Sequence, residues 1–256
     1  TEIAKYMWET LQRFGFHKGN LLEPSMGIGN FFSVMELKND DVKRYGVEID
    51  PLTGRIAKQL YPKANIQIKG LQETRFENNF FDVAIGNIPF GEFKVNDVKY
   101  NRFNLFIHDY FIVKVLDLVR PGGIIALITS KGTMDKADAS VRRLMAQKAS
   151  LIGAVRLPDK AFHHSGTKVT CDILCFQKKD HATDDEPEWL ETGFIDGYRV
   201  NNYFLSHMSN MLGSIEAVTR FGSDRKMYTI SNKDFHPDMV KDILDSFHAI
   251  LPEPVL

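Results

Sequence analysis

The pattern of apolar and polar residues predicts a sheet in which strands alternate with helices along most of the chain. Short apolar runs rich in β-branched residues, closed by Gly, Pro or acidic residues, predict buried strands. Longer stretches with apolar residues three and four positions apart predict helices. Strands are expected at 21–22, 45–50, 64–69, 82–85, 123–129, 151–157 and 170–178, and helices at 2–14, 31–37, 51–60, 103–119 and 137–147. We therefore predict an α/β fold with a doubly wound, mostly parallel Rossmann-like sheet. The last strand is expected to be antiparallel, because no helix precedes it.

The character of the sequence changes after Lys179. Residues 180–188 are acidic and contain a proline, which predicts a linker that follows a first domain of residues 1–179. The remaining residues, 189–256, contain helical fragments and are expected to form a small helical appendage. Because the chain has no initiating Met and ends beside two prolines, we expect it to be part of a longer protein.

A glycine turn follows the first predicted strand. Glu23 stands at the carboxyl end of this strand, and Gly27-Ile28-Gly29 follows it. Glycines allow a ligand to approach the backbone closely, and the next helix begins with free N–H groups. An acidic residue here would repel a phosphate, so the pattern favours a ligand with a cationic amino group.

The second and third predicted strands also end in candidate ligand-binding residues. Glu48 lies 19 residues after Gly29, and an acidic residue at this distance commonly binds the two hydroxyls of a ribose. Asp50 is expected to cap the next helix instead. Leu71 and Gln72 could flank an adenine ring, although a plain loop is an equally good interpretation.

The fourth strand leads into the turn Asn87-Ile88-Pro89-Phe90, the central feature of the chain. The Asn87 side-chain oxygen and the Ile88 carbonyl could accept the two hydrogens of a planar amine, while Phe90 stacks on the attached ring. The polar segment 91–102 that follows could cover a site or be a solvated loop.

Composition narrows the class of protein. The 256 residues carry a formal net charge of −1, which counts against strong autonomous DNA binding but leaves room for a local basic surface. Cys171 and Cys175 form no disulfide framework and a poor zinc site, so an intracellular, cytoplasmic location without a metal is expected. No apolar run approaches a membrane span and no signal peptide is recognisable, so we expect no membrane partner.

The motifs together resemble class I S-adenosylmethionine-dependent methyltransferases, and more narrowly the DNA adenine-N6 methyltransferases. Residues 21–31 match the cofactor motif, 47–51 match the ribose motif, and 87–90 match the catalytic Asn-Pro-Pro-Phe or Asn-Pro-Pro-Tyr motif. Residues 121–130 and 157–178 are similar to the late strands of type I restriction–modification methyltransferase subunits. Helicase–methyltransferase polypeptides of conjugative elements and phages carry similar motifs.

The resemblance implies S-adenosylmethionine as cofactor and DNA as partner, with a target adenine flipped out of the helix. It also implies a recognition subunit or further domains of a longer polypeptide. Phe90 and Phe162 would stack on the adenine, and the catalytic residues would be Asn87, Ile88, Pro89 and Phe90. The implied cofactor-binding residues are Glu23, Pro24, Gly27, Gly29, Asn30, Glu48, Leu71, Gln72 and Asn87.

The chain departs from the family pattern at Ile88, where the family has proline. The backbone carbonyl at this position is kept, but the turn loses the rigidity of a proline ring. Two other functions stay open. The same fold could methylate a glutamine side chain or the exocyclic amine of guanine in RNA, or it could be a catalytically silent module of a larger assembly.

Overall fold

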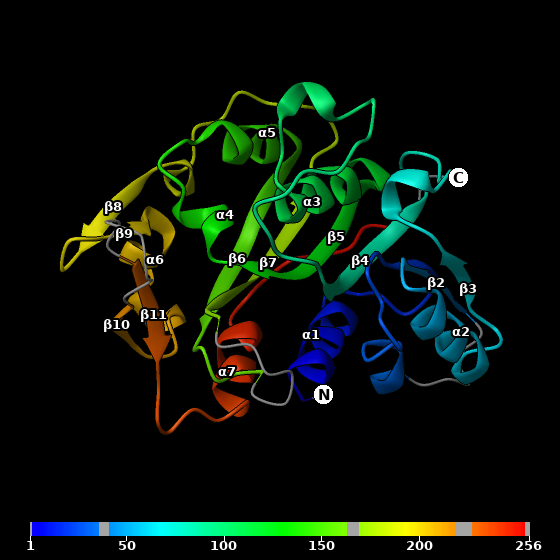
Figure 1. Ribbon diagram of the computed structural model, residues 1–256, viewed down its shortest axis with the longest axis horizontal. Coiled ribbons are helices and arrows are strands. Elements are labelled where there is room, and N and C mark those ends of the chain that lie inside the picture. Colours follow the sequence, from blue (N-terminus) through cyan, green and yellow to red (C-terminus); the bar gives the residue numbers. More distant parts are fainter. Residues whose placement is uncertain (1, 36–40, 163–168, 219–226, 254–256) are drawn as a thin grey trace.

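The computed structural model describes residues 2–35, 41–162, 169–218 and 227–253, which are organised around a seven-stranded sheet (Figure 1). The strand order is β3-β2-β1-β4-β5-β7-β6. Strands β1 to β5 pair in parallel, and β7 runs antiparallel to both of its neighbours. The predicted Rossmann-like sheet with an antiparallel last strand is therefore confirmed. The strands are β1 (Gly19–Glu23), β2 (Val42–Glu48), β3 (Asn65–Ile68), β4 (Phe81–Asn87), β5 (Val119–Ser130), β6 (Ala149–Leu157) and β7 (Cys171–Lys178).

Helices cover both faces of the sheet because the central strands bury side chains on both sides. In β4, Val83 and Ile85 belong to the core under one set of helices, whereas Ala84 between them belongs to the opposite core. This period of two is the geometry of a strand covered on both faces. The first core contains residues of α1 (Glu2–Arg13), α2 (Pro51–Leu60) and α7 (Asp238–Asp245), and the second contains residues of α3 (Ile107–Leu118), α4 (Gly132–Asp135) and α5 (Ser140–Lys148).

The helix predicted at 31–37 is wrong for the residues that the structure describes there. A single 3-10 turn, Phe32–Val34, takes its place. Met35 is already extended (φ −91°, ψ 147°) and its side chain is buried. The apolar spacing of this stretch thus reflects side chains that fill the core rather than a continuing helix.

The prediction that the region after residue 188 is helical is incomplete, because this region also contains two pairs of antiparallel strands. The described residues of this region contain two α-helices, α6 (Asn202–Ser206) and α7. They also contain four strands that the prediction did not include, β8 (Thr192–Ile195), β9 (Tyr198–Asn201), β10 (Ser214–Val218) and β11 (Met227–Ser231). Asp196 and Gly197 join β8 to β9 with positive φ angles of 51° and 79°. Asp-Gly is a strong signal for such a two-residue hairpin turn.

This C-terminal region packs into the cores of the sheet. Trp189, Phe204 and Ile230 lie in the core that contains α3, and α7 lies against α1 on the other face (Figure 1). The Arg13 guanidinium donates to the carbonyls of residues 244 and 247, at 2.6 and 2.7 Å. The domain division at residue 179 stays a prediction. None of the helices in the described ranges has the length and hydrophobicity needed to cross a bilayer.

Candidate functional site

The predicted motifs meet at the edge of the sheet where the parallel strands end. Glu23 ends β1 opposite Gly46 of β2, and Asn87 ends β4 opposite Ile128 of β5. The strand order reverses direction between β1 and β4. Ligands of doubly wound sheets bind in the crevice outside the carboxyl ends at this switch point.

Glu23 is a buried carboxylate with spare hydrogen-bonding capacity. It is 1% exposed, and its Oε2 atom has no hydrogen-bond partner in the part of the chain that the structure describes. Burial raises the pKa of Glu23 well above its ordinary value, and the charge of Glu48 raises it slightly further. Hydrogen bonds from the N–H groups of Phe31 and Phe32 lower this pKa but do not outweigh burial. Such an atom is suited to a cationic or hydrogen-bond-donating ligand.

The glycine turn lies beside this carboxylate and leaves space for a ligand. Gly27 has φ +56°, and a Cβ atom placed on it would meet no atom within 4 Å. Gly29 has φ +88°, and a Cβ atom there would lie 2.4 Å from the Tyr61 ring. The first glycine therefore faces open space, and the second is required by the close packing of Tyr61, whose hydroxyl donates to the Gly29 carbonyl at 2.8 Å.

Glu48 ties the second strand to the glycine turn. Its Oε2 accepts a hydrogen bond from the Gly27 N–H, and its Oε1 accepts one from the Asp50 N–H, both at 2.8 Å. Each carboxylate oxygen can accept a further bond, so both stay competent to bind ribose hydroxyls. Asp50 caps α2 by accepting from the Thr53 N–H at 2.7 Å, which confirms the expected cap.

A cleft of about 420 Å³ opens next to these residues. Its volume lies in the range of small-molecule sites, and its lining is mainly apolar. Three predicted cofactor residues, Pro24, Leu71 and Gln72, line it. The others are not among its lining residues, namely Glu23, Gly27, Gly29, Asn30, Glu48 and Asn87, and Asn30 is exposed. Several other lining residues come from segments that the sequence indicated, namely the cofactor and ribose motifs (Ser25, Val47, Ile49), the turn at 87–90 (Pro89) and the segment 91–102 (Phe93, Lys94, Val95, Asn96). The sequence did not single out Lys69, Gly70, Ile107 and Phe111.

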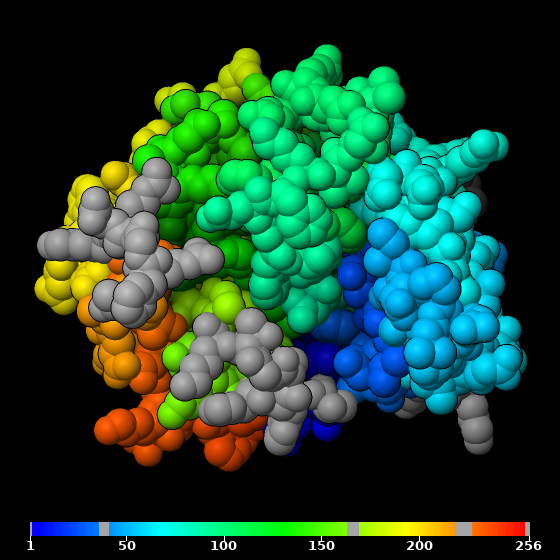
Figure 2. Space-filling model, viewed as in Figure 1, coloured from blue at the N-terminus to red at the C-terminus, as the bar shows by residue number. Residues whose placement is uncertain are grey.

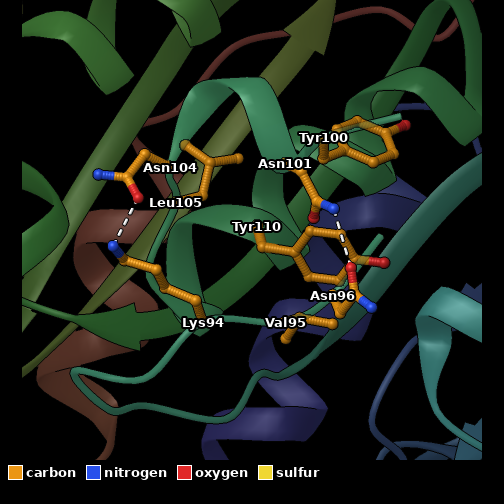
Figure 3. Close-up of a pocket in the computed structure, with 8 residues that line it drawn as sticks. All are labelled: Lys94, Val95, Asn96, Tyr100, Asn101, Asn104, Leu105 and Tyr110. Carbon is orange, nitrogen blue, oxygen red and sulfur yellow. Dashed lines mark hydrogen bonds between the residues drawn. The ribbon is translucent and has the colours of Figure 1, made fainter. Parts of the chain in front are cut away.

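The segment after the predicted catalytic turn forms one wall of the cleft and is held by its own contacts. Asp97 accepts hydrogen bonds from the Tyr110 hydroxyl and the Lys114 ammonium, both at 2.8 Å. A smaller hollow of about 290 Å³ lies within this segment, where the Asn101 amide donates to Asn96 at 2.8 Å (Figure 3). Figure 2 shows this blue-green segment at the surface, beside the blue N-terminal residues. It is an ordered wall, and its function as a cover stays a prediction.

At the predicted catalytic turn, the structure leaves the Asn87 amide without a partner among the described residues. The Asn87 side chain is exposed and forms no hydrogen bond with any described residue. Ile88 is 2% exposed, and its N–H donates to the Ile128 carbonyl at 3.1 Å. A proline could not make this bond. The buried side chain and the added hydrogen bond therefore hold the turn in place of the missing ring.

The two predicted base-stacking residues share one side of the sheet. Phe90 and Phe162 are both partly buried against the core that contains α1. Phe162 comes from the loop between β6 and β7, of which residues 163–168 lie outside the described part of the chain.

The comparison with known proteins gives the family. A model described as N-6 DNA methylase matches residues 2–210. The chain belongs to the N-6 DNA methylase family. "Defense against restriction protein B" of Escherichia phage P1 is 32% identical to this chain over 181 residues, which are 69% of the chain and 8% of the phage protein. The chain therefore spans only a small part of the length of that relative.

Solved structures show that this member of the N-6 DNA methylase family has the fold of S-adenosylmethionine-dependent methyltransferases. A Listeria monocytogenes structure assigned to class I of these enzymes superimposes with a TM-score of 0.59 and 24% identity, covering 72% of this chain and 60% of the other. The M protein of the type I restriction enzyme EcoKI superimposes with a TM-score of 0.57 and 14% identity, covering 95% of this chain and 68% of the other. The predicted resemblance to type I methyltransferase subunits is thus confirmed at the level of fold.

The site of this family member fits S-adenosylmethionine. The unpartnered Glu23 oxygen suits the cationic methionine portion, the open space at Gly27 suits close backbone approach, and Glu48 suits a ribose. The apolar cleft beside Leu71 suits a purine ring. We expect these residues to hold the cofactor.

Replacing Glu23 by Gln in this family member should weaken cofactor binding and stabilise the fold. Loss of a charged hydrogen-bonding group should weaken S-adenosylmethionine binding by at least about 10-fold. Burial raises the pKa of Glu23, so the folded chain binds the Glu23 proton more tightly than the unfolded chain does. This tighter binding adds to the free energy of unfolding at low pH, and the contribution is lost as the pH rises through the raised pKa. At neutral pH, the variant should therefore unfold at a higher urea concentration than the native chain. The two urea midpoints should become equal at about pH 4. Unchanged cofactor affinity, measured by titration calorimetry, would contradict the role of Glu23.

Proposed function

We propose that this chain transfers a methyl group from S-adenosylmethionine to the N6 amine of an adenine in DNA. The observation that carries the proposal is the free Asn87 amide, which ends β4 at the same edge as the Glu23 carboxylate and the open glycine turn. When bound, the cofactor would supply an electrophilic methyl group on its sulfonium.

The residues of the chain would prepare the acceptor nitrogen. The Asn87 Oδ1 and the Ile88 carbonyl would accept the two amino hydrogens, which localises the nitrogen lone pair that is otherwise delocalised into the ring. Phe90 and Phe162 would hold the flipped base between their rings, an interaction worth about 1–3 kcal/mol per stacked base. The nitrogen would become positively charged, and therefore acidic, as it gains the methyl group, and it would then pass one proton to water, so no strong base is needed before transfer. Alignment would provide much of the rate.

The family relatives support a role connected with restriction. The phage P1 relative is named for defence against restriction, and the EcoKI relative is the M protein of a type I restriction enzyme. The N6 amine of adenine lies in the major groove, where proteins read the base sequence. Methylation at this atom would change what a restriction enzyme reads.

Product analysis tests the proposal. The chain would be incubated with methyl-labelled S-adenosylmethionine and, separately, with DNA, RNA and a glutamine-containing peptide, and the products digested and separated. The proposal expects N6-methyladenine from DNA alone. Label in guanine or glutamine would overturn the assigned acceptor, and cofactor binding without any transfer would indicate the silent module.

Replacing Ile88 by Pro should leave methyl transfer largely intact. The variant restores the family residue but loses the hydrogen bond to the Ile128 carbonyl, worth about 1 kcal/mol, so we expect a rate within about 10-fold of the native chain. Asn87 already lies in a strand, the conformation that a following proline requires. Initial rates of label transfer provide the measurement. A loss as large as that of an Asn87 variant would show that the N–H bond cannot be replaced.

A further inference from the structure

A half-buried lysine at the catalytic edge has no anionic partner. Lys131 directly follows the last residue of β5, and β5 is the strand that pairs with the catalytic strand β4. Its ammonium forms no hydrogen bond or ion pair with any residue of the described ranges. Its ammonium instead lies over the Tyr228 ring, 4.0 Å from the ring centroid.

The carboxylates whose charges act on Lys131 are Asp135 and Asp172, and both already accept hydrogen bonds from other residues. The Arg156 guanidinium binds Asp172 through two hydrogen bonds of 2.7 Å and Asp135 through bonds of 3.0 and 3.1 Å. The Tyr228 hydroxyl also donates to Asp135, at 2.6 Å. Burial lowers the pKa of Lys131, more than the charge of Asp135 raises it. A desolvated ammonium in this position would be stabilised by an added anion.

The ring under Lys131 is held by a hairpin that lies beyond the family match. That match ends at residue 210, whereas Tyr228 belongs to β11, and its hydroxyl reaches Asp135 at the end of α4. Thr170, at the start of β7, accepts from the Ile230 N–H at 2.8 Å and bonds the Thr229 hydroxyl at 2.9 Å. On the other side of the β6–β7 loop, the Asp159 N–H donates to the Ile230 carbonyl at 2.8 Å. Strand β11 thus holds both the platform for Lys131 and the ends of the loop that carries the predicted base-stacking phenylalanine.

We propose that Lys131, supported on the ring of Tyr228, binds a phosphodiester of the strand that carries the target adenine. This inference rests on the proposed function. Lys131 lies three residues beyond Ile128, which is paired with Asn87 in the sheet. Strand β5 lies between β4, which ends at Asn87, and β7, which follows the loop that carries Phe162. A base inserted between Phe90 and Phe162 would bring its own phosphates to this edge. The ammonium would supply a positioning contact that is independent of sequence.

The salt dependence of DNA binding tests this assignment. Binding of the native chain, Lys131→Gln and Lys131→Arg to a short adenine-containing duplex, and to its component single strand, would be measured over a range of salt concentrations with the cofactor present. Each phosphate contact contributes about −0.9 to the slope of log affinity against log salt for a duplex, and about −0.7 for a single strand. We expect Lys131→Gln to reduce the steepness of the slope by about 1, and Lys131→Arg to keep it.

A matched control separates the local contact from net charge. Lys58 is exposed on α2, and Lys58→Gln changes the net charge by the same amount while leaving the catalytic edge intact. Its slope should equal that of the native chain. An unchanged slope in Lys131→Gln, with a lower free energy of unfolding, would mean that Lys131 only balances the buried carboxylates and would overturn the assignment. If the native chain bound cofactor but no DNA, the proposed function would fall, and this inference with it.

Discussion

Replacing Asn87 by Ala should abolish detectable methyl transfer while leaving cofactor binding nearly unchanged. The Asn87 amide is exposed at the end of β4 and bonds no described residue, so its removal disturbs no contact of the fold that the structure shows. It would remove one of the two acceptors for the amino hydrogens. Loss of a single preorganised polar group of this kind lowers catalytic rates by about 10²–10³-fold. Transfer of label to DNA gives the rate, and calorimetric titration gives the cofactor affinity.

A second asparagine provides the control for this substitution. Asn65 is also exposed, but it begins β3 and so lies at the opposite edge of the sheet. Asn65→Ala should transfer methyl groups at the native rate. If Asn87→Ala lost transfer and cofactor affinity in equal measure, Asn87 would be a cofactor-binding residue rather than the group that prepares the acceptor.

Replacing Asp172 by Ala should cause the largest loss of stability. Arg156 and Asp172 are both fully buried, and their two hydrogen bonds are each 2.7 Å long. Burial alone would lower the pKa of Arg156, but Asp135 and Asp172 outweigh it and raise that pKa, so the arginine stays charged. Removing one partner of a buried pair leaves an uncompensated charge and costs about 3–5 kcal/mol. The free energy of unfolding from urea denaturation measures the loss.

An exposed ion pair gives the comparison for this stability prediction. Lys5 and Glu9 lie one turn apart on α1, 3.7 Å from each other, and both side chains are largely exposed. Because water screens such a pair, Glu9→Ala should change the free energy of unfolding by less than about 1 kcal/mol. A similar small loss in Asp172→Ala would show that water reaches the Arg156 guanidinium and that the buried network does not stabilise the fold.

Much of the sheet and of its ligand-binding edge could be predicted because the signals are local. The strands are short apolar runs with clear ends, and the glycines at 27 and 29 occur where the backbone needs positive φ. The Asp50 cap follows from an aspartate before a proline, and it forms as expected. The antiparallel strand β7 could be predicted because the sequence between it and β6 has no helical pattern that would supply a crossover.

The rest depends on contacts between distant residues, which local patterns do not contain. Ile107 and Phe111 line the cleft, yet in the sequence they are ordinary apolar residues of a buried helix. The hydrogen bond from Ile88 to Ile128 requires the register of β4 on β5. The β8–β9 hairpin was the exception, since the Asp196-Gly197 turn was a local signal that the helical interpretation of this region overlooked.

The most direct test of the account is to map N6-methyladenine in a host that lacks adenine methylation of its own. The native chain and Asn87→Ala would be expressed in parallel, at equal levels of folded protein, and the host DNA sequenced for the modified base. The account predicts methylated adenines with the native chain and none with the variant. Methylation at the same sites in both strains would contradict the central role of Asn87. Absence of methylation with the native chain, although it binds S-adenosylmethionine, would contradict DNA adenine methylation by this chain alone.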